Sequence, residues 1–218
     1  MATARSASSR RARARRGEGQ RLRQEILAAA TRLLAETGDE EAVSIRAVAE
    51  AVGVTPPSIY LHFADKTELI FAVCEEQFRQ LDAEMAMAEA GVADPLEGLR
   101  RRGQAYVRFG LGNAEAYRVL FMYKDRVPDN VDERYLYRSD TFNHLVEAVQ
   151  RCLDAGAFRP GDPFQIAIGL WVLVHGITSL LLAAPAFPWP QEPDELVDRL
   201  ITDHLQGLLP GRPADPGL

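Results

Sequence analysis

Residues 44–69 read SIRAVAEAVGVTPPSIYLHFADKTEL, and this stretch predicts two short helices joined by a tight turn. Ser44 suits the N-cap of the first helix, because its hydroxyl can accept a hydrogen bond from an unpaired backbone N–H. Gly53 follows the helically spaced apolar residues of that helix, at a point where glycine adopts a left-handed backbone without a Cβ clash. The turn is therefore predicted at Gly53.

The second helix is predicted to begin after Thr55, whose hydroxyl can cap it. Pro56 and Pro57 fall in its first turn, where backbone N–H groups lack helical partners in any case. Ile59 and Phe63 lie four residues apart and are expected to pack the second helix onto the first. The residues left on other faces of the second helix are Ser58, Leu61 and His62.

A third helix is predicted to begin at Asp65, since Glu68 three residues later resembles a capping box. Two helices joined by a short turn with glycine form the unit that places its second helix in the major groove of DNA. The same geometry also occurs as an ordinary helical corner, so these features alone leave both interpretations open.

The residues of this stretch narrow the choice. The run A49-E-A-V-G53-V-T55-x-x-S58-I-Y60-x-H62-F63-x-D65-K66-x-x-L69 resembles the DNA-binding signature of the TetR family of bacterial one-component regulators. The resemblance implies that Tyr60, His62 and Lys66 approach DNA phosphates, and that Ser44 and Thr55 add hydroxyl or helix-terminal phosphate contacts. Such contacts set the register on DNA without reading its sequence. The alternatives are a half-buried core tyrosine at Tyr60 and a solvated surface histidine at His62.

Pro56 and Pro57 depart from the family pattern, because relatives often carry glycine or a polar residue there. Fewer side chains are then available to bond base edges. Leu61 could contact a thymine methyl group, and it is predicted to read bases together with Thr55, Ser58 and Arg46. The full predicted DNA-binding set is Ser44, Arg46, Thr55, Pro56, Pro57, Ser58, Tyr60, Leu61, His62 and Lys66.

Charge is distributed unevenly along the chain. The 218 residues carry a formal net charge of −6, yet the first 25 contain eight arginines and only two glutamates. Such a basic end indicates nucleic acid. Residues 1–19 are predicted to be a disordered arm that contacts phosphates or the minor groove; the alternative is a solvated tail. Two widely separated cysteines predict no disulfide framework and a cytoplasmic protein.

Apolar residues recur at helical spacing along the rest of the chain, and no strand-like alternation occurs. The predicted fold is therefore all-α. A three-helix helix-turn-helix DNA-binding domain over residues 20–66 is joined by a long helix, from about Asp65 to Gly91, to a larger helical ligand-binding and dimerisation domain over residues 67–209. Further helices are expected at 94–113, 117–122, 128–156, 164–184 and 196–208. Residues 210–218 are predicted to be a disordered tail.

Residues 164–184 are almost continuously apolar and long enough to span a bilayer. Polar side chains inside the segment, including Gln165, Thr178 and Ser179, argue against a membrane helix. A helix apolar on nearly every side is expected to pack on its own domain and on a partner subunit. The last two helices match in position the pair through which TetR-like proteins dimerise. A two-fold homodimer would read both half-sites of a palindromic operator.

The string W171-x-x-x-H175-G176 resembles a motif of one subgroup of TetR C-terminal domains. Trp171 and His175 lie one helical turn apart, either at a ligand or as core residues. A preformed apolar cavity would indicate a sensor, whereas a solidly packed domain would indicate an architectural DNA binder. The predicted ligand-binding residues are Tyr106, Phe109, Phe121, Met122, Phe142, Leu145, Trp171 and His175.

The predicted function is a ligand-responsive DNA-binding transcriptional regulator, namely a repressor released from its operator by a small, largely apolar effector. The alternative is a ligand-independent or activating regulator of the same fold. No catalytic motif, metal-ligand spacing or cofactor-binding loop is found in the sequence. An enzyme is therefore not expected, and no cofactor is predicted.

Overall fold

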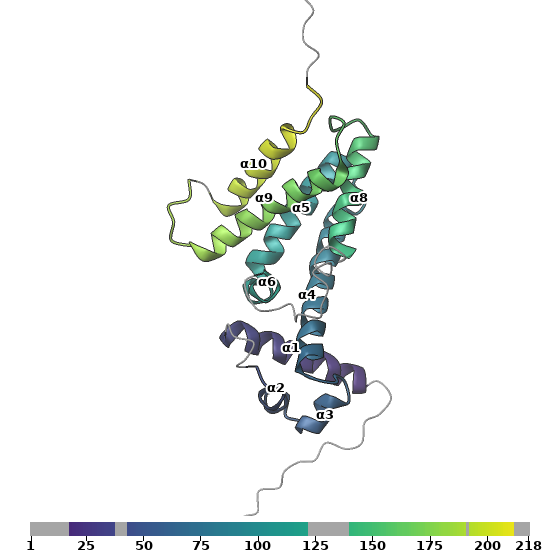
Figure 1. Ribbon diagram of the computed structural model, residues 1–218. Helices are drawn as coiled ribbons and strands as arrows, with labels where there is room; N and C mark the ends of the chain where they lie inside the picture. The colour runs from purple at the N-terminus through teal and green to yellow at the C-terminus, as the bar shows by residue number, and fades with distance from the viewer. Residues whose placement is uncertain (1–17, 38–42, 122–139, 191, 212–218) are drawn as a thin grey trace, which may run out of the picture.

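A computed structural model describes residues 18–37, 43–121, 140–190 and 192–211, and within these ranges every regular element is a helix (Figure 1). The all-α prediction is confirmed for them. Four predictions concern residues outside these ranges: the contacts of the arm before residue 18, the ligand contact of Met122, the helix start near Pro128, and the tail after residue 211. The helices are α1 (Glu18–Thr37), α2 (Ile45–Val52), α3 (Pro56–Tyr60), α4 (Lys66–Glu89), α5 (Pro95–Gly112), α6 (Ala114–Phe121), α8 (Asp140–Asp154), α9 (Pro163–Ala183) and α10 (Pro193–Gln206).

Two separate apolar cores are joined by α4, which runs from the lower three-helix unit into the upper helical layer (Figure 1). The first core gathers buried side chains from Ile26 to Val73, and the second gathers those from Leu81 to Leu205. The division between the cores therefore falls inside α4, between Val73 and Leu81, some way beyond the boundary at residue 66 expected from the sequence. The first two residues of α1, Glu18 and Gly19, were expected in the arm and are helical.

Aspartate caps fix the starts of three long helices. The Asp65 carboxylate accepts a hydrogen bond from Glu68 N (2.8 Å) at α4, and Asp94 accepts one from Leu96 N (3.0 Å) at α5. Asp162 caps α9 in the same way. Each bond satisfies a backbone N–H that the helix itself leaves unpaired. The caps predicted at Asp65 and Asp94 are confirmed.

The centre of the upper domain is α5, which packs against α4, α6, α8, α9 and α10. Gly110 lies close against α9, because an added Cβ would come closer than 3.0 Å to the buried Cγ2 of Thr178. A side chain at position 110 would therefore push the two helices apart.

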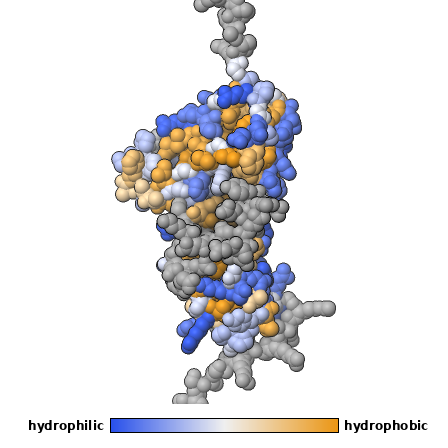
Figure 2. Space-filling view, viewed as in Figure 1, coloured by the Kyte–Doolittle hydropathy of each residue, from blue (hydrophilic) through white to orange (hydrophobic). Residues whose placement is uncertain are grey.

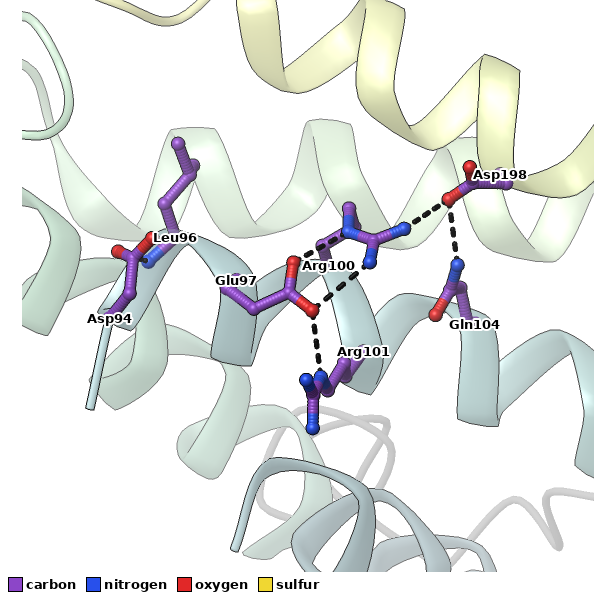
Figure 3. A network of polar contacts seen from close by, with 7 residues as sticks. All are labelled: Asp94, Leu96, Glu97, Arg100, Arg101, Gln104 and Asp198. Carbon is purple, nitrogen blue, oxygen red and sulfur yellow. Dashed lines mark hydrogen bonds and ion pairs between the residues drawn. The ribbon is translucent and has the colours of Figure 1, made fainter. Parts of the chain in front are cut away.

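A polar network on the surface attaches α10 to α5 (Figure 3). Arg100 pairs with Glu97 on its own helix and with Asp198 on α10, and Gln104 also donates to Asp198 (2.7 Å). Hydrogen bonds from Arg100 and Arg101 lower the pKa of Glu97 to about 2. The carboxylate therefore stays charged, and it orients Arg100 toward α10.

By length and composition alone, α9 is apolar enough to cross a membrane. In the structure it packs against α5, α8 and α10. Only 33% of its most apolar window is buried, however, and Val172 (59%) and Leu180 (57%) are largely exposed. Figure 2 shows apolar surface gathered over this upper part of the molecule. The helix thus covers its own core with one side and leaves an apolar stripe on the other.

Candidate DNA-binding surface and ligand cavity

The turn between α2 and α3 has the predicted geometry. The Ser44 hydroxyl accepts a hydrogen bond from Ala47 N (3.1 Å), which caps α2. Gly53 ends α2 in the left-handed region with φ 74° and ψ 34°. A residue with a Cβ would be strained in this conformation. The two caps together set the angle at which the chain enters α3.

The predicted second helix is shorter than expected. It ends at Tyr60, so Leu61 and His62 lie in the turn that follows it rather than on helix faces. The reason is local: the Ile59 carbonyl accepts from both His62 N (2.9 Å) and Phe63 N (3.1 Å), and Asp65 then caps α4 almost at once. Ile59 and Phe63 are both buried, as predicted.

Thr55 occupies the N-cap of α3, but its hydroxyl caps no backbone N–H among the described residues. It lies 3.2 Å from the Ser58 hydroxyl instead. The cause is the pair Pro56 and Pro57, which removes the first two backbone donors of the helix. The next donor, Ser58 N, bonds the Thr55 carbonyl (2.8 Å). The expected side-chain cap at Thr55 is therefore wrong.

All ten residues of the predicted DNA-binding set lie at the surface, either exposed or half-exposed. Tyr60 is 54% exposed and Leu61 is 84% exposed, so neither side chain belongs to the buried core. The half-buried His62 lies beside the start of α1, near Gly19. The surface thus presents hydroxyl, imidazole and ammonium groups around an exposed leucine, a combination suited to phosphates and to a thymine methyl group.

A cavity of about 90 Å³ lies in the second core and is lined by residues of α4, α5, α6, α8, α9 and α10. It is smaller than the roughly 300–1,000 Å³ typical of pockets for drug-sized ligands. Five of the predicted ligand-binding residues line it, namely Tyr106, Phe121, Phe142, Leu145 and Trp171. An apolar pocket is therefore present before any ligand binds, and a large ligand would have to widen it.

Two predicted ligand residues are not among the described residues that line the cavity, Phe109 and His175. Phe109 is buried in the second core one turn beyond Tyr106 on α5. His175 belongs to a polar cluster: its Nδ1 lies 2.7 Å from the Tyr117 hydroxyl and 3.3 Å from the Tyr106 hydroxyl. Tyr117 also approaches the hydroxyl of Ser179 (3.3 Å).

Burial governs the charge state of this cluster. It lowers the pKa of His175 and raises the pKa of Tyr117 and of Tyr106. The imidazole is therefore neutral at pH 7, and the Tyr117 hydroxyl also donates to the His175 backbone carbonyl (3.2 Å). These bonds are those expected of a hydrogen-bonded core histidine, and the ligand contact at His175 stays a prediction.

Sequence reasoning missed one charged residue of the cavity wall, Arg102. Its side chain is only 2% exposed and pairs with Asp82 (2.9 Å) and Glu89 (3.4 Å), both on α4. The run Arg100-Arg101-Arg102 reads as solvated charge. A signal was available nonetheless, because Leu99, Arg102 and Tyr106 share one face of α5 at three- and four-residue spacing.

Metal ions have no evident site: among the described residues, no group of three or more His, Cys, Asp or Glu side chains could hold one.

Comparisons with known proteins agree with this geometry. The family described as bacterial regulatory proteins, tetR family, matches residues 26–73, and the family described as tetracyclin repressor-like, C-terminal domain, matches residues 99–204. The resemblance to a narrower subgroup at Trp171, His175 and Gly176 stays a prediction.

Two individual relatives are HTH-type transcriptional regulators. The chain is 24% identical over 162 residues to the HTH-type transcriptional regulator HbdR of Aromatoleum sp. (strain CIB), covering 70% of this chain and 69% of that protein. It is 38% identical over 92 residues to the regulator AcrR of Shigella flexneri, covering 41% of each. A solved structure from Rhodococcus sp. RHA1, of unknown function, superimposes with a TM-score of 0.73 at 26% identity, covering 87% of this chain and 96% of that one.

Proposed function

The chain belongs to the TetR family of DNA-binding transcriptional regulators, and we propose that it is a cytoplasmic, dimeric repressor released from its operator by a small, largely apolar effector. One observation carries the proposal: two of the helices that line the cavity, α4 and α6, also pack against α1 of the DNA-binding unit. Leu81 and Met85 line the cavity from α4, whose first turns belong to the first core. The family membership excludes an enzyme as the primary function.

A second helix connects the same two regions. Phe121 lines the cavity from α6, and α6 packs against both α1 and α4. Its ring meets the ring of Phe78 on α4 edge-on, with 5.7 Å between the centroids. An effector that displaces Phe121 or Met85 would thus move α4 and α6, and with them the unit that carries Tyr60 and Lys66. A coupling free energy of about 1–3 kcal/mol would change operator affinity by roughly 5–150-fold.

At the DNA, Tyr60, His62 and Lys66 contact phosphates in this proposal, helped by the hydroxyls of Ser44 and Thr55. Leu61 lies in the groove, with Arg46 and Ser58 nearby. Leu61 is 84% exposed, so its side chain is free to enter the groove.

The second copy is proposed to pack on α9 and α10. Support comes from the exposed stripe with Val172 and Leu180, and from Gly176 on the same helix, where an added Cβ would meet nothing within 4 Å. Glycine and exposed aliphatic residues let a partner helix approach closely. Two copies related by a two-fold axis would read two half-sites about 34–36 Å apart, or a multiple of that distance, in a palindromic operator.

The proposed repressor function is tested by measuring operator affinity with and without small molecules. Duplexes bound by the full chain are selected from a random pool, and affinity for the selected operator is measured by fluorescence anisotropy while apolar small molecules are added. An effector that binds the protein should weaken operator binding by the factor above. Unchanged affinity with every molecule that binds would refute the release mechanism, and tighter binding would favour the ligand-dependent activator.

A pair of variants localises the effector. Leu145→Trp fills the cavity and should abolish the response while leaving operator binding intact. Leu209→Trp adds the same bulk at an exposed position outside the cavity and should leave the response unchanged. A response that survives Leu145→Trp would place the effector elsewhere.

A further inference from the structure

Arg102 is the one charged side chain among the described residues that line the apolar cavity. Two of its nitrogens are engaged: Nη2 donates to Asp82 Oδ1 (2.9 Å) and Nη1 to Glu89 Oε1 (3.4 Å). The Asp82 carboxylate also contacts His144 on α8, and Glu89 also contacts Arg151 there. The guanidinium therefore connects the cavity to α4 and, through the carboxylates, to α8.

The third nitrogen of the guanidinium is different. Nε of Arg102 has almost no accessible surface and no hydrogen-bond partner among the described residues, so a ligand in the cavity reaches it only when the side chain moves slightly. Leaving a buried donor unpaired costs about 1–3 kcal/mol, and more when the group is charged. Two polar groups of the cavity wall are already paired, because the Thr141 hydroxyl bonds the Phe78 carbonyl (3.5 Å) and the Tyr106 hydroxyl approaches His175 (3.3 Å).

We propose that Arg102 is the polar anchor of the effector site, and that its Nε–H donates a hydrogen bond to the carbonyl oxygen of an otherwise apolar effector. The inference rests on the proposed function, since it takes this cavity as the effector site. The effector class is then a compact apolar ketone, ester or amide. The apolar body fills the space between Phe142, Leu145 and Trp171, and the oxygen meets Arg102.

The charges around Arg102 favour a neutral oxygen over a carboxylate. Two carboxylates, Asp82 and Glu89, already face the guanidinium. One oxygen of Glu89 is itself buried without a hydrogen-bond donor among the described residues. A third negative charge here would repel both carboxylates in a region of low dielectric. A carbonyl oxygen accepts the same hydrogen bond without that repulsion.

The position of Arg102 also ties recognition to the linking helix. Asp82 and Glu89 both belong to α4, so the side chain that binds the effector is the one that holds α4 against α5. Any shift of the guanidinium toward the effector changes these two ion pairs. Arg102 thus couples effector binding to the helix that leads to the DNA-binding unit.

Three probes of one shape test the head group: acetophenone (C=O), α-methylstyrene (C=CH₂) and benzoate (carboxylate). Their binding to the full chain is measured by calorimetry without DNA. Arg102→Lys keeps the positive charge for Asp82 and Glu89 but removes the Nε–H. A hydrogen bond to a charged group contributes about tenfold or more in affinity, so the ratio of acetophenone to α-methylstyrene affinity should fall about tenfold in Arg102→Lys. Arg100→Lys on the same helix, outside the cavity, should keep the wild-type ratio.

A wild-type measurement covers the case in which Arg102→Lys fails to fold. The ¹⁵N–¹H resonance of the Arg102 Nε–H should shift when acetophenone is added and stay in place with α-methylstyrene. An unmoved resonance, no binding of any probe, or benzoate binding as tightly as acetophenone would overturn the anchor. Release of the operator by an effector without a carbonyl would also overturn it, while leaving the proposed repressor function standing.

Discussion

Replacing Gly110 by alanine tests whether the close approach of α5 and α9 supports the sensor domain. The new Cβ would lie closer than 3.0 Å to Thr178 Cγ2 and 3.0 Å from Tyr117 Cδ2. Thr178 is fully buried, and its hydroxyl is held by the Val174 carbonyl (2.7 Å), so its methyl group cannot turn away freely. Overpacking of this kind costs about 1–3 kcal/mol, and the contact here belongs at the upper end. Alanine also favours the helix over glycine by about 1 kcal/mol. The free energy of unfolding should therefore fall by about 2 kcal/mol in total.

Urea unfolding followed by tryptophan fluorescence measures this loss, because both tryptophans of the chain, Trp171 and Trp189, belong to the second domain. Gly112→Ala is the matched control on the same helix, since an added Cβ at that position would meet nothing within 4 Å. It should be neutral or slightly stabilising.

A second substitution identifies the contact. Thr178→Ser removes Cγ2 and keeps the hydroxyl, so Gly110→Ala should cost markedly less in the Thr178→Ser background than in the wild type. The double-mutant cycle isolates this interaction. Wild-type stability in Gly110→Ala, or an equal loss in both backgrounds, would show that the contact between these residues does not limit the packing of α5 on α9.

Three further predictions concern DNA binding and pH. Lys66→Ala should weaken binding to all sequences alike and lower the slope of log affinity against log salt by about one; an unchanged slope in anisotropy titrations would remove Lys66 from the phosphate contacts. Leu61→Ala should change the preference among operator variants in the same assay, and a uniform loss would contradict base reading. The pKa values of His175 and His204 are lowered by burial, so the unfolded state binds protons at a higher pH than the folded state. The free energy of unfolding should therefore fall as pH drops below about 6.5, and His175→Gln should reduce this dependence in urea titrations at several pH values; an undiminished dependence would contradict the assignment.

Local features of the fold were predictable from the sequence because they depend on a few neighbouring residues. Ser44, Gly53 and Asp65 act within three or four positions along the chain, and each has the cap or backbone conformation expected of it. The apolar periodicity likewise predicted the long helices. The error at Thr55 has the same local origin, because the two prolines after it remove the donors that its hydroxyl would have capped.

The cavity was harder to predict, since its wall combines residues from six helices. Apolar character was enough to identify five of the lining residues. It could not distinguish them from residues such as Phe109, which is packed in the core and is not among the lining residues. The hydrogen bonds of His175 could not be predicted for a related reason: its partners, Tyr106 and Tyr117, lie 69 and 58 positions away. Periodicity within one helix carries no information about such distant partners.

Arg102 shows why stability alone does not explain the composition of the cavity wall. Buried ion pairs cost several kcal/mol per ion in desolvation, and apolar residues of similar volume often stabilise a core as well or better. A leucine or methionine at position 102 would continue the apolar face of α5 and leave Asp82 and Glu89 free to be apolar as well. With Arg102 in place, the contact between α4 and α5 depends on the ion pairs of one guanidinium with Asp82 and Glu89. A contact of that kind can be changed by a ligand oxygen far more readily than an interlocked apolar contact, which favours a switching role for this part of the second core.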